Sequence, residues 1–217
     1  MLVSHRHRFI YTKTTKTAGT SVESFFERFC MTEGTWTFQH AREEYVSEAG
    51  IIGYRGVDAS GKQWFNHMAA ETIRAQLGEE TWNSYFKFAV IRDPFDKVVS
   101  GYFFATQANG EAADIIADFR RWLGEGGAAS VMDRHNYVID EALCLDYFIR
   151  YETLLEGIQS VCERVGVDYD ATSLPRLKAE FRQRDIPLAD FYDAAAIAAV
   201  EDCYGFELEQ FGYRAPC

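Results

Sequence analysis

Residues 9–30 read FIYTKTTKTAGTSVESFFERFC, and this stretch decides the expected fold. Its first four residues are β-prone. Apolar residues then recur at positions 22, 25, 26, 29 and 30, which is the spacing of one face of a helix. Residues 13–21 therefore form a loop that leads from the end of a strand to the N-terminus of a helix.

A loop in this place is suited to binding an anion. The first backbone N–H groups of a helix have no partner within the helix, and the helix dipole adds partial positive charge there. Gly19 lets the backbone approach an anion closely, and Lys16 supplies a mobile positive charge. Hydroxyl donors come from Thr17, Thr20 and Ser21. The loop predicts a phosphate site, although the same residues alone also fit a capped helix with a surface lysine.

The order of the loop residues distinguishes it from two common nucleotide sites. The P-loop of kinases and NTPases reads GxxxxGK[ST], with the lysine after the glycines. Here Lys16 comes first, and no glycine precedes Gly19 within the loop. The dinucleotide fingerprint GxGxxG is also missing from the sequence. This order disfavours ATP as the ligand.

A second element follows at residues 86–102, which read FKFAVIRDPFDKVVSGY. It predicts a buried strand over 86–91 and then a helix, with Asp93 as its N-cap and Pro94 at its first position. Arg92 follows the C-terminal end of the strand, where ligands bind in open α/β sheets. Its guanidinium could hold a phosphate through two hydrogen bonds, and Ser100 could add a hydroxyl two turns later. The alternative is that Arg92 only forms an ion pair with Asp93 or Asp96.

The remaining pattern alternates strands with helices. Further elements are expected as a helix over 67–77 between an Asn66 N-cap and a Gly78 stop, a helix from Ile115 to near Gly124, a strand over 145–151, a helix over 153–165 ended by Gly166, and a last helix over about 193–211. Residues 31–65 are interpreted as a long irregular connection bordering the acceptor site. The alternation predicts a mostly parallel sheet covered by helices, in a single domain over residues 1–217.

Composition excludes several classes of partner. The formal net charge of −11 disfavours nucleic acid and anionic membranes, because both repel an acidic surface. Five cysteines without a CxxC pair predict neither a zinc site nor a disulfide framework. No apolar run suits a signal peptide or a membrane span, so we expect a cytoplasmic protein without membrane insertion. The oligomeric state is left open.

The two motifs together resemble those of the sulfotransferases that use 3′-phosphoadenosine-5′-phosphosulfate (PAPS), especially the branch of carbohydrate 2-O-sulfotransferases and their bacterial relatives. Residues 16–21, including Ala18, are similar to the family's 5′-phosphosulfate loop, and residues 90–100 to its 3′-phosphate element. Residues 148–154 and 211–213 are similar to its late strand and its ending. The chain departs from the family pattern at Lys13, Ala18 and Lys97, where histidine, glycine and arginine are common.

The resemblance implies a fold, a donor and a mechanism. The fold is a P-loop-like three-layer α/β domain. The donor is PAPS, the product is adenosine 3′,5′-bisphosphate (PAP), and no metal is required. Lys16 stabilises the leaving phosphate, and residues 16–21 with Arg92 and Ser100 bind the donor. The acceptor is a small molecule or carbohydrate bearing a hydroxyl.

The acceptor hydroxyl also needs a base, and His67 is our candidate because a neutral imidazole accepts a proton near neutral pH. The alternative is a histidine that caps a helix or lies in the core. His40 is the second candidate for the base. Two other functions stay open at this point: a nucleotide kinase or NTPase, and a nucleotide-binding module of the same fold without catalysis.

Overall fold

A computed structural model of the chain describes residues 1–108, 112–173 and 186–217. The chain divides into two compact units, which are described separately. The sheet unit comprises residues 1–91 and 133–177, and the helical unit comprises residues 92–132 and 178–217. The expectation of a single domain over 1–217 stays a prediction.

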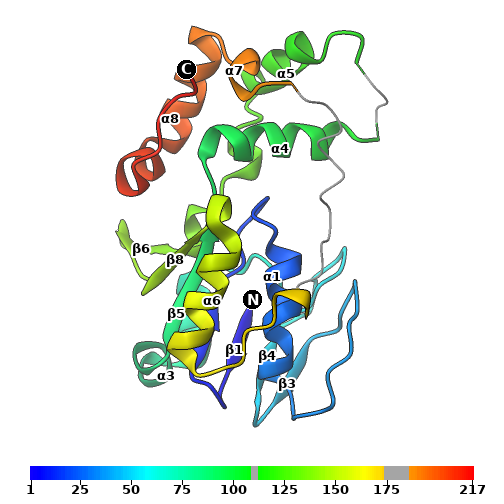
Figure 1. Ribbon diagram of the computed structural model, residues 1–217, viewed down its shortest axis with the longest axis vertical. Helices are drawn as coiled ribbons and strands as arrows, with labels where there is room; N and C mark the ends of the chain where they lie inside the picture. Colours follow the sequence, from blue (N-terminus) through cyan, green and yellow to red (C-terminus); the bar gives the residue numbers. More distant parts are fainter. Residues whose placement is uncertain (109–111, 174–185) are drawn as a thin grey trace. The chain divides into compact units, whose positions relative to one another are not determined.

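The sheet unit is built on a six-stranded sheet with the strand order β3-β4-β1-β2-β5-β8 (Figure 1). The strands are β1 (Leu2–Ser4), β2 (Phe9–Tyr11), β3 (Tyr45–Ser47), β4 (Gly50–Ile52), β5 (Phe86–Ile91) and β8 (Tyr147–Arg150). β5 pairs in parallel with β2 and with β8, and β1, β4 and β3 extend the sheet by antiparallel pairing. The strands that adjoin the two predicted motifs are therefore the parallel ones. A separate hairpin joins β6 (Val138–Ile139) to β7 (Ala142–Leu143).

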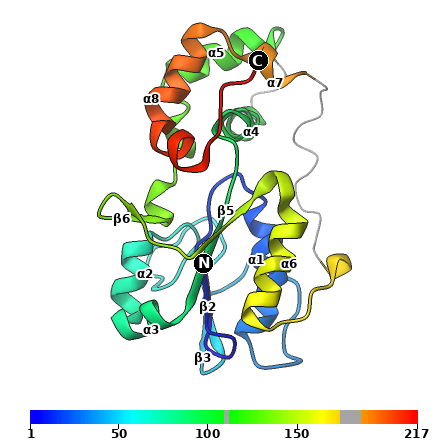
Figure 2. The same cartoon turned by 60° about the vertical axis from the view of Figure 1, so that its left-hand side comes forward.

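Helices cover both faces of this sheet (Figure 2). Side chains alternate between the faces of a strand, so Phe9 and Tyr11 of β2 lie in one apolar cluster and Ile10 in another. The first cluster includes residues of α1 (Gly19–Phe26) and α6 (Leu154–Val165). The second includes residues of α2 (Ala70–Leu77) and α3 (Glu79–Ser84). The unit thus has three layers, helix, sheet and helix.

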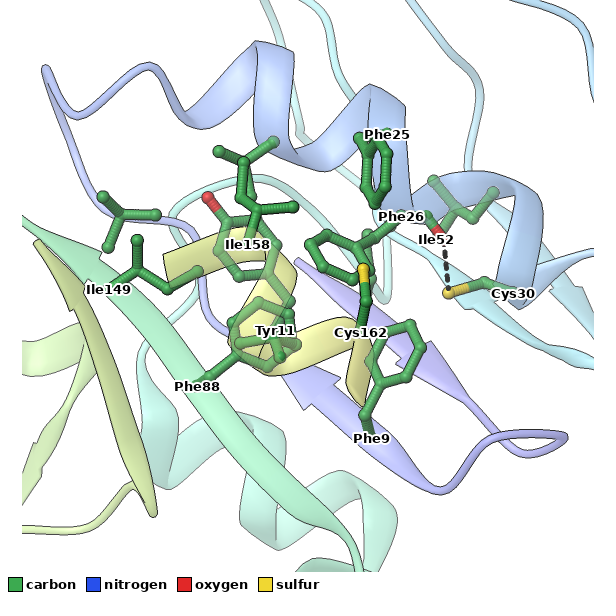
Figure 3. Packing of buried hydrophobic residues seen from close by; sticks show 14 of the residues in the cluster. Phe9, Tyr11, Phe25, Phe26, Cys30, Ile52, Phe88, Ile149, Ile158 and Cys162 are labelled. Atoms are coloured by element: carbon green, nitrogen blue, oxygen red, sulfur yellow. Dashed lines mark hydrogen bonds between the residues drawn. The ribbon is translucent and has the colours of Figure 1, made fainter. Parts of the chain in front are cut away.

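Aromatic packing dominates the first cluster, which Figure 3 shows from close by. Phe26 lies fully buried between Phe9 and Phe88, with ring centroids 5.6 and 5.1 Å away. Truncating a buried phenylalanine of this kind to alanine costs about 3–5 kcal/mol. This packing holds α1, and hence the loop before it, against the sheet.

The helical unit contains α4 (Pro94–Thr106), α5 (Ile115–Gly124), α7 (Leu188–Phe191) and α8 (Ala194–Phe211). Its core joins apolar residues of all four helices. The Tyr192 hydroxyl donates to the Phe95 carbonyl oxygen at 2.7 Å, which fastens the chain after α7 to the start of α4. The Asp93 side chain accepts from the Phe95 N–H at 2.8 Å, so the predicted N-cap of α4 is confirmed.

Most predicted elements are confirmed within a few residues. Gly166 ends α6 in the left-handed conformation (φ 67°), and Gly78 follows α2. Two predictions are wrong. The helix expected over 67–77 begins only at Ala70, and Asn66 does not cap it. The stretch 31–65 contains the β3–β4 hairpin and is not irregular throughout.

Candidate functional site

The predicted phosphate loop lies between β2 and α1 and is anchored to the neighbouring strand. The Thr14 hydroxyl donates to the carbonyl oxygen of Val90, near the C-terminal end of β5, at 2.5 Å. The same hydroxyl lies 2.8 Å from the hydroxyl of Thr17. Thr17 is fully buried and its hydroxyl also approaches the Thr14 carbonyl oxygen. The hydrogen bonds of these two threonines hold the loop backbone in its conformation and fasten it to β5.

Lys16 and Ala18 both adopt the left-handed backbone conformation, with φ of 59° and 55°. Ala18 is the N-cap of α1, and its carbonyl accepts from the N–H of Ser21 at 2.9 Å. Left-handed residues in a loop turn successive N–H groups toward one side, which forms a concave site for an anion. Lys16 and Thr20 are partly exposed, whereas Ser21 is buried.

Gly19 is closely packed inside the loop. A Cβ atom at this position would lie 3.0 Å from Cγ of Lys13 and 3.1 Å from the carbonyl oxygen of Thr14. Both contacts are tighter than ordinary van der Waals separation. The glycine thus lets the first turn of α1 approach the start of the loop.

Asp133 holds the middle of the loop, and sequence reasoning did not find it. Its fully buried carboxylate accepts the backbone N–H of Thr15 at 2.5 Å. Thr15 directly precedes Lys16, so the contact helps to fix the position of the Lys16 backbone. The two residues lie 118 positions apart in the sequence, and no local pattern marks their pairing.

His67 lies beside the loop. Its Nδ1 is 3.1 Å from the carbonyl oxygen of Lys13. A carbonyl oxygen only accepts, so Nδ1 carries the proton and the lone pair of the neutral ring is on Nε2. Dehydration of the ring and the positive charge of Lys13 both lower the pKa of His67, to about 4. The residue is nevertheless exposed at the surface, so a ligand can reach it.

The backbone at His67 is strained, with φ of 58°. Left-handed residues other than glycine cost of order 1–3 kcal/mol and persist where the surrounding contacts hold them. The contacts here are the Lys13 carbonyl oxygen on the ring and a backbone hydrogen bond from Asn66 to Tyr54 at 2.9 Å. The second candidate base, His40, is exposed, and its carbonyl oxygen accepts from Arg55 at 2.8 Å.

A buried cluster of charges lies behind the loop. Glu23 on α1 is fully buried and accepts from Lys13 Nζ at 2.7 Å and from Arg55 at 2.6 Å. Burial alone would raise the pKa of Glu23, but the nearby positive charges hold it well below its usual range. Lys13 is 3% exposed, so its charge lies inside the protein and is matched by Glu23.

Arg92 and Ser100 of the second predicted element belong to the helical unit, whereas its strand, β5, belongs to the sheet unit. Arg92 forms an ion pair with Asp96, whose Oδ2 is 2.7 Å from Nε and 2.7 Å from a terminal nitrogen of the guanidinium. The ion-pair alternative for Arg92 is thus present in the structure. Ser100 is partly buried and lies one turn beyond Asp96 on the same face of α4. Arg92 precedes α4 by two positions and pairs with Asp96 in its first turn, and Ser100 follows one turn later.

The sequence profile of the Sulfotransferase family matches residues 1–214. This chain belongs to the sulfotransferase family. The match covers nearly the whole chain and includes both predicted motifs. No curated protein matches the sequence.

Two solved sulfotransferases have related structures. Mouse sulfotransferase SULT7A1, complexed with PAP, is 10% identical with a TM-score of 0.50, over 95% of this chain and 86% of that chain. A sulfotransferase from Alicyclobacillus acidocaldarius is 13% identical with a TM-score of 0.39, over 90% of this chain and 94% of that chain. The first likeness, with the layered sheet unit, confirms the predicted P-loop-like α/β fold.

The described residues contain neither a cluster suited to a metal ion nor a helix suited to a membrane. Residues 1–108, 112–173 and 186–217 hold no group of three or more His, Cys, Asp or Glu side chains placed to bind a metal ion. In the same part of the chain, no helix has the length and apolar character needed to cross a membrane.

Proposed function

We propose that this sulfotransferase transfers the sulfuryl group of PAPS to a hydroxyl of a small-molecule or carbohydrate acceptor, with Lys16 and His67 as its catalytic residues. The observation that carries the proposal is the placement of His67 on the Lys13 carbonyl oxygen, at the start of the loop that bears Lys16. A non-catalytic module would have no need of an exposed, strained histidine beside its phosphate loop. The family match favours sulfuryl transfer over the kinase alternative.

In the proposed reaction the acceptor oxygen attacks the sulfur in line with the bond to the 5′-phosphate. The new S–O bond forms as the bond between sulfur and the bridging phosphate oxygen breaks, and PAP leaves. Negative charge develops on that bridging oxygen, where Lys16 and the N–H groups at the start of α1 stabilise it. No metal takes part.

The proton of the acceptor hydroxyl passes to Nε2 of His67. Because Nδ1 is held by the Lys13 carbonyl oxygen, Nε2 is the atom with the available lone pair. The lowered pKa keeps the ring neutral throughout the physiological range, so that the lone pair on Nε2 stays available, and it also makes the ring a weaker base than an ordinary histidine.

We assign the rest of the donor to two groups of residues. The 5′-phosphosulfate binds the loop of Lys16, Thr17, Ala18, Gly19, Thr20 and Ser21. The 3′-phosphate binds Arg92, which pairs with Asp96, and Ser100, which lies one helical turn after Asp96 on α4. The Asp96 carboxylate orients the guanidinium of Arg92, and an incoming phosphate would compete for its N–H groups.

The acceptor and location are also proposals. We infer a carbohydrate hydroxyl as acceptor, as in the 2-O-sulfotransferase branch, from the resemblance of the two motifs. We infer a cytoplasmic location because the sequence has an odd number of widely spaced cysteines and no CxxC pair, a pattern that favours a reducing compartment over a disulfide framework.

The test is a transfer assay with radiolabelled PAPS and a panel of carbohydrates, phenols and simple alcohols. Labelled product from a carbohydrate, lost in the Lys16→Ala variant, supports the proposal. Labelled product from phenols alone would contradict the carbohydrate assignment. If no acceptor is labelled and bound PAPS stays intact, sulfuryl transfer to a hydroxyl is contradicted.

A further inference from the structure

Helix α1 carries two buried carboxylates one turn apart, Glu23 and Glu27, which the proposed mechanism does not use. Both side chains are fully buried, and both form ion pairs with Arg55. A buried charge is costly unless it is paired and hydrogen-bonded. Two such groups on the helix that follows the phosphate loop need a structural or functional reason.

The remaining partners of the two carboxylates differ. Glu27 pairs with Arg42 at 3.1 Å and accepts from the indole N–H of Trp36 at 3.1 Å. Both partners belong to the stretch 31–65. Glu27 thus fastens that connection to α1.

Glu23 instead pairs with the N-terminal ammonium of Met1, at 3.1 Å, and contacts the two residues that hold His67. Its Oε2 accepts from Lys13 Nζ at 2.7 Å. Asn66, with its amide oriented to suit both neighbours, donates to Glu23 Oε1 at 2.8 Å and accepts from Lys13 Nζ at 3.1 Å. Lys13 binds the ring of His67 through its carbonyl oxygen, and Asn66 precedes His67 in the chain.

We propose that Glu23 is a positioning residue for His67, holding Lys13 and Asn66 so that the imidazole keeps its Nδ1 on the Lys13 carbonyl oxygen and its Nε2 available. The proposal rests on the proposed role of His67 as the base. Glu23 does not touch the reacting atoms. Its carboxylate acts through the side chains of Lys13 and Asn66.

The contacts explain three features that otherwise stand apart. They explain why a charged lysine is buried at the start of the loop, since Glu23 matches its charge. They explain why Asn66 does not cap a helix, since its side chain is bound to Glu23 and Lys13. They also fix the side chains of Lys13 and Asn66, the two residues whose backbone contacts accompany the left-handed conformation of His67.

Glu23→Gln tests the proposal, with Glu27→Gln as the matched control. Both substitutions remove a buried charge from α1, an ion pair with Arg55 and a second ion pair, with the N-terminal ammonium for Glu23 and with Arg42 for Glu27. Only the first removes the carboxylate that binds Lys13 and Asn66. We expect Glu23→Gln to lower kcat about 10–100-fold, as displacement of a catalytic group does, with the affinity for PAP changed less than about threefold. Glu27→Gln should keep kcat within about threefold of the wild-type value.

Asn66→Ala is a second variant, which keeps the test decisive if Glu23→Gln does not fold. It removes one link to His67 while leaving both buried carboxylates in place. Asn83→Ala is its control, because Asn83 is exposed on α3 and its side chain donates to the exposed Glu79, at 3.4 Å. We expect the kcat of Asn66→Ala to fall and that of Asn83→Ala to match the wild type.

Nitrogen NMR of labelled histidine reads the tautomer of His67 directly and does not depend on turnover. The wild type should show a protonated Nδ1 and an unprotonated Nε2, and Glu23→Gln and Asn66→Ala should show a mixture of the two tautomers. An unchanged tautomer in the folded variants, or an equal loss of kcat in Glu27→Gln, would overturn the proposal. A changed tautomer with full turnover would support the positioning and overturn the role of His67 as the base.

Discussion

The imidazole Nδ1 of His67 lies 3.1 Å from the carbonyl oxygen of Lys13, although the two residues are 54 positions apart in the sequence. The contact places a histidine of the stretch before α2 against the loop that precedes α1. Lys16, the candidate phosphate ligand, follows Lys13 by three positions in this loop. The candidate base thus contacts the loop that bears the candidate phosphate ligand, within the sheet unit.

Lys16→Ala should reduce turnover about 100–1,000-fold, the usual loss when one group that stabilises the developing charge is removed. The fold should be kept, because the side chain is partly exposed. Initial rates with labelled PAPS measure the loss, and circular dichroism checks the fold. The control is Lys62→Ala, which removes an exposed ion pair with Glu43 and should leave turnover intact. A Lys16→Ala variant with wild-type turnover would remove Lys16 from the mechanism.

His67→Asn should reduce kcat at least about 100-fold, as loss of a general base does, with little effect on PAP affinity. Asparagine tolerates the left-handed backbone better than alanine does, so the substitution tests the imidazole and not the turn. The pH profile gives a second readout. With the pKa of His67 at about 4, wild-type kcat should decline only as the pH falls through that value, because the protonated ring accepts no proton. A decline centred on the ordinary histidine pKa would be inconsistent with this environment.

Arg92→Ala should weaken PAP binding about 10–100-fold, since hydrogen bonds to charged groups contribute about 1.5–3 kcal/mol each. Calorimetry measures the affinity. Arg121→Ala is the matched control, because Arg121 pairs with Asp118 on α5 as Arg92 pairs with Asp96. Equal PAP affinities in Arg92→Ala and the wild type would assign Arg92 a structural role in α4 alone.

Ala18→Gly should stabilise the protein by about 1 kcal/mol, because it relieves a left-handed alanine at the N-cap of α1. Chemical denaturation measures the change. Ala198→Gly, at an exposed position inside α8, should have the opposite effect and destabilise by about 1 kcal/mol. Loss of stability in both variants would show that the loop holds Ala18 without strain.

The sequence was most informative where a local rule determines the structure. The spacing of apolar residues after Ser21 predicts α1, and Asp93 with Pro94 predicts the start of α4, because capping chemistry is local. Gly166 predicts the end of α6 for the same reason. None of these three predictions required knowledge of contacts between distant residues.

Contacts between distant residues could not be predicted in this way. The periodicity of α1 assigns its apolar face, yet Glu23 is buried as completely as Phe26, because Arg55 and Lys13 reach it from other segments. The strands of the β3–β4 hairpin are three residues long, too short for alternation to stand out. Asn66 has the residue type of an N-cap, but its side chain is bound to Glu23 and Lys13.

The most direct test of the donor assignment is calorimetric binding of PAP in the presence of EDTA, compared with binding of ATP and magnesium. The sulfotransferase account predicts tight binding of PAP without any metal, weakened by Lys16→Ala and by Arg92→Ala. Preferential binding of magnesium-ATP, or no binding of PAP by the wild-type protein, would contradict it.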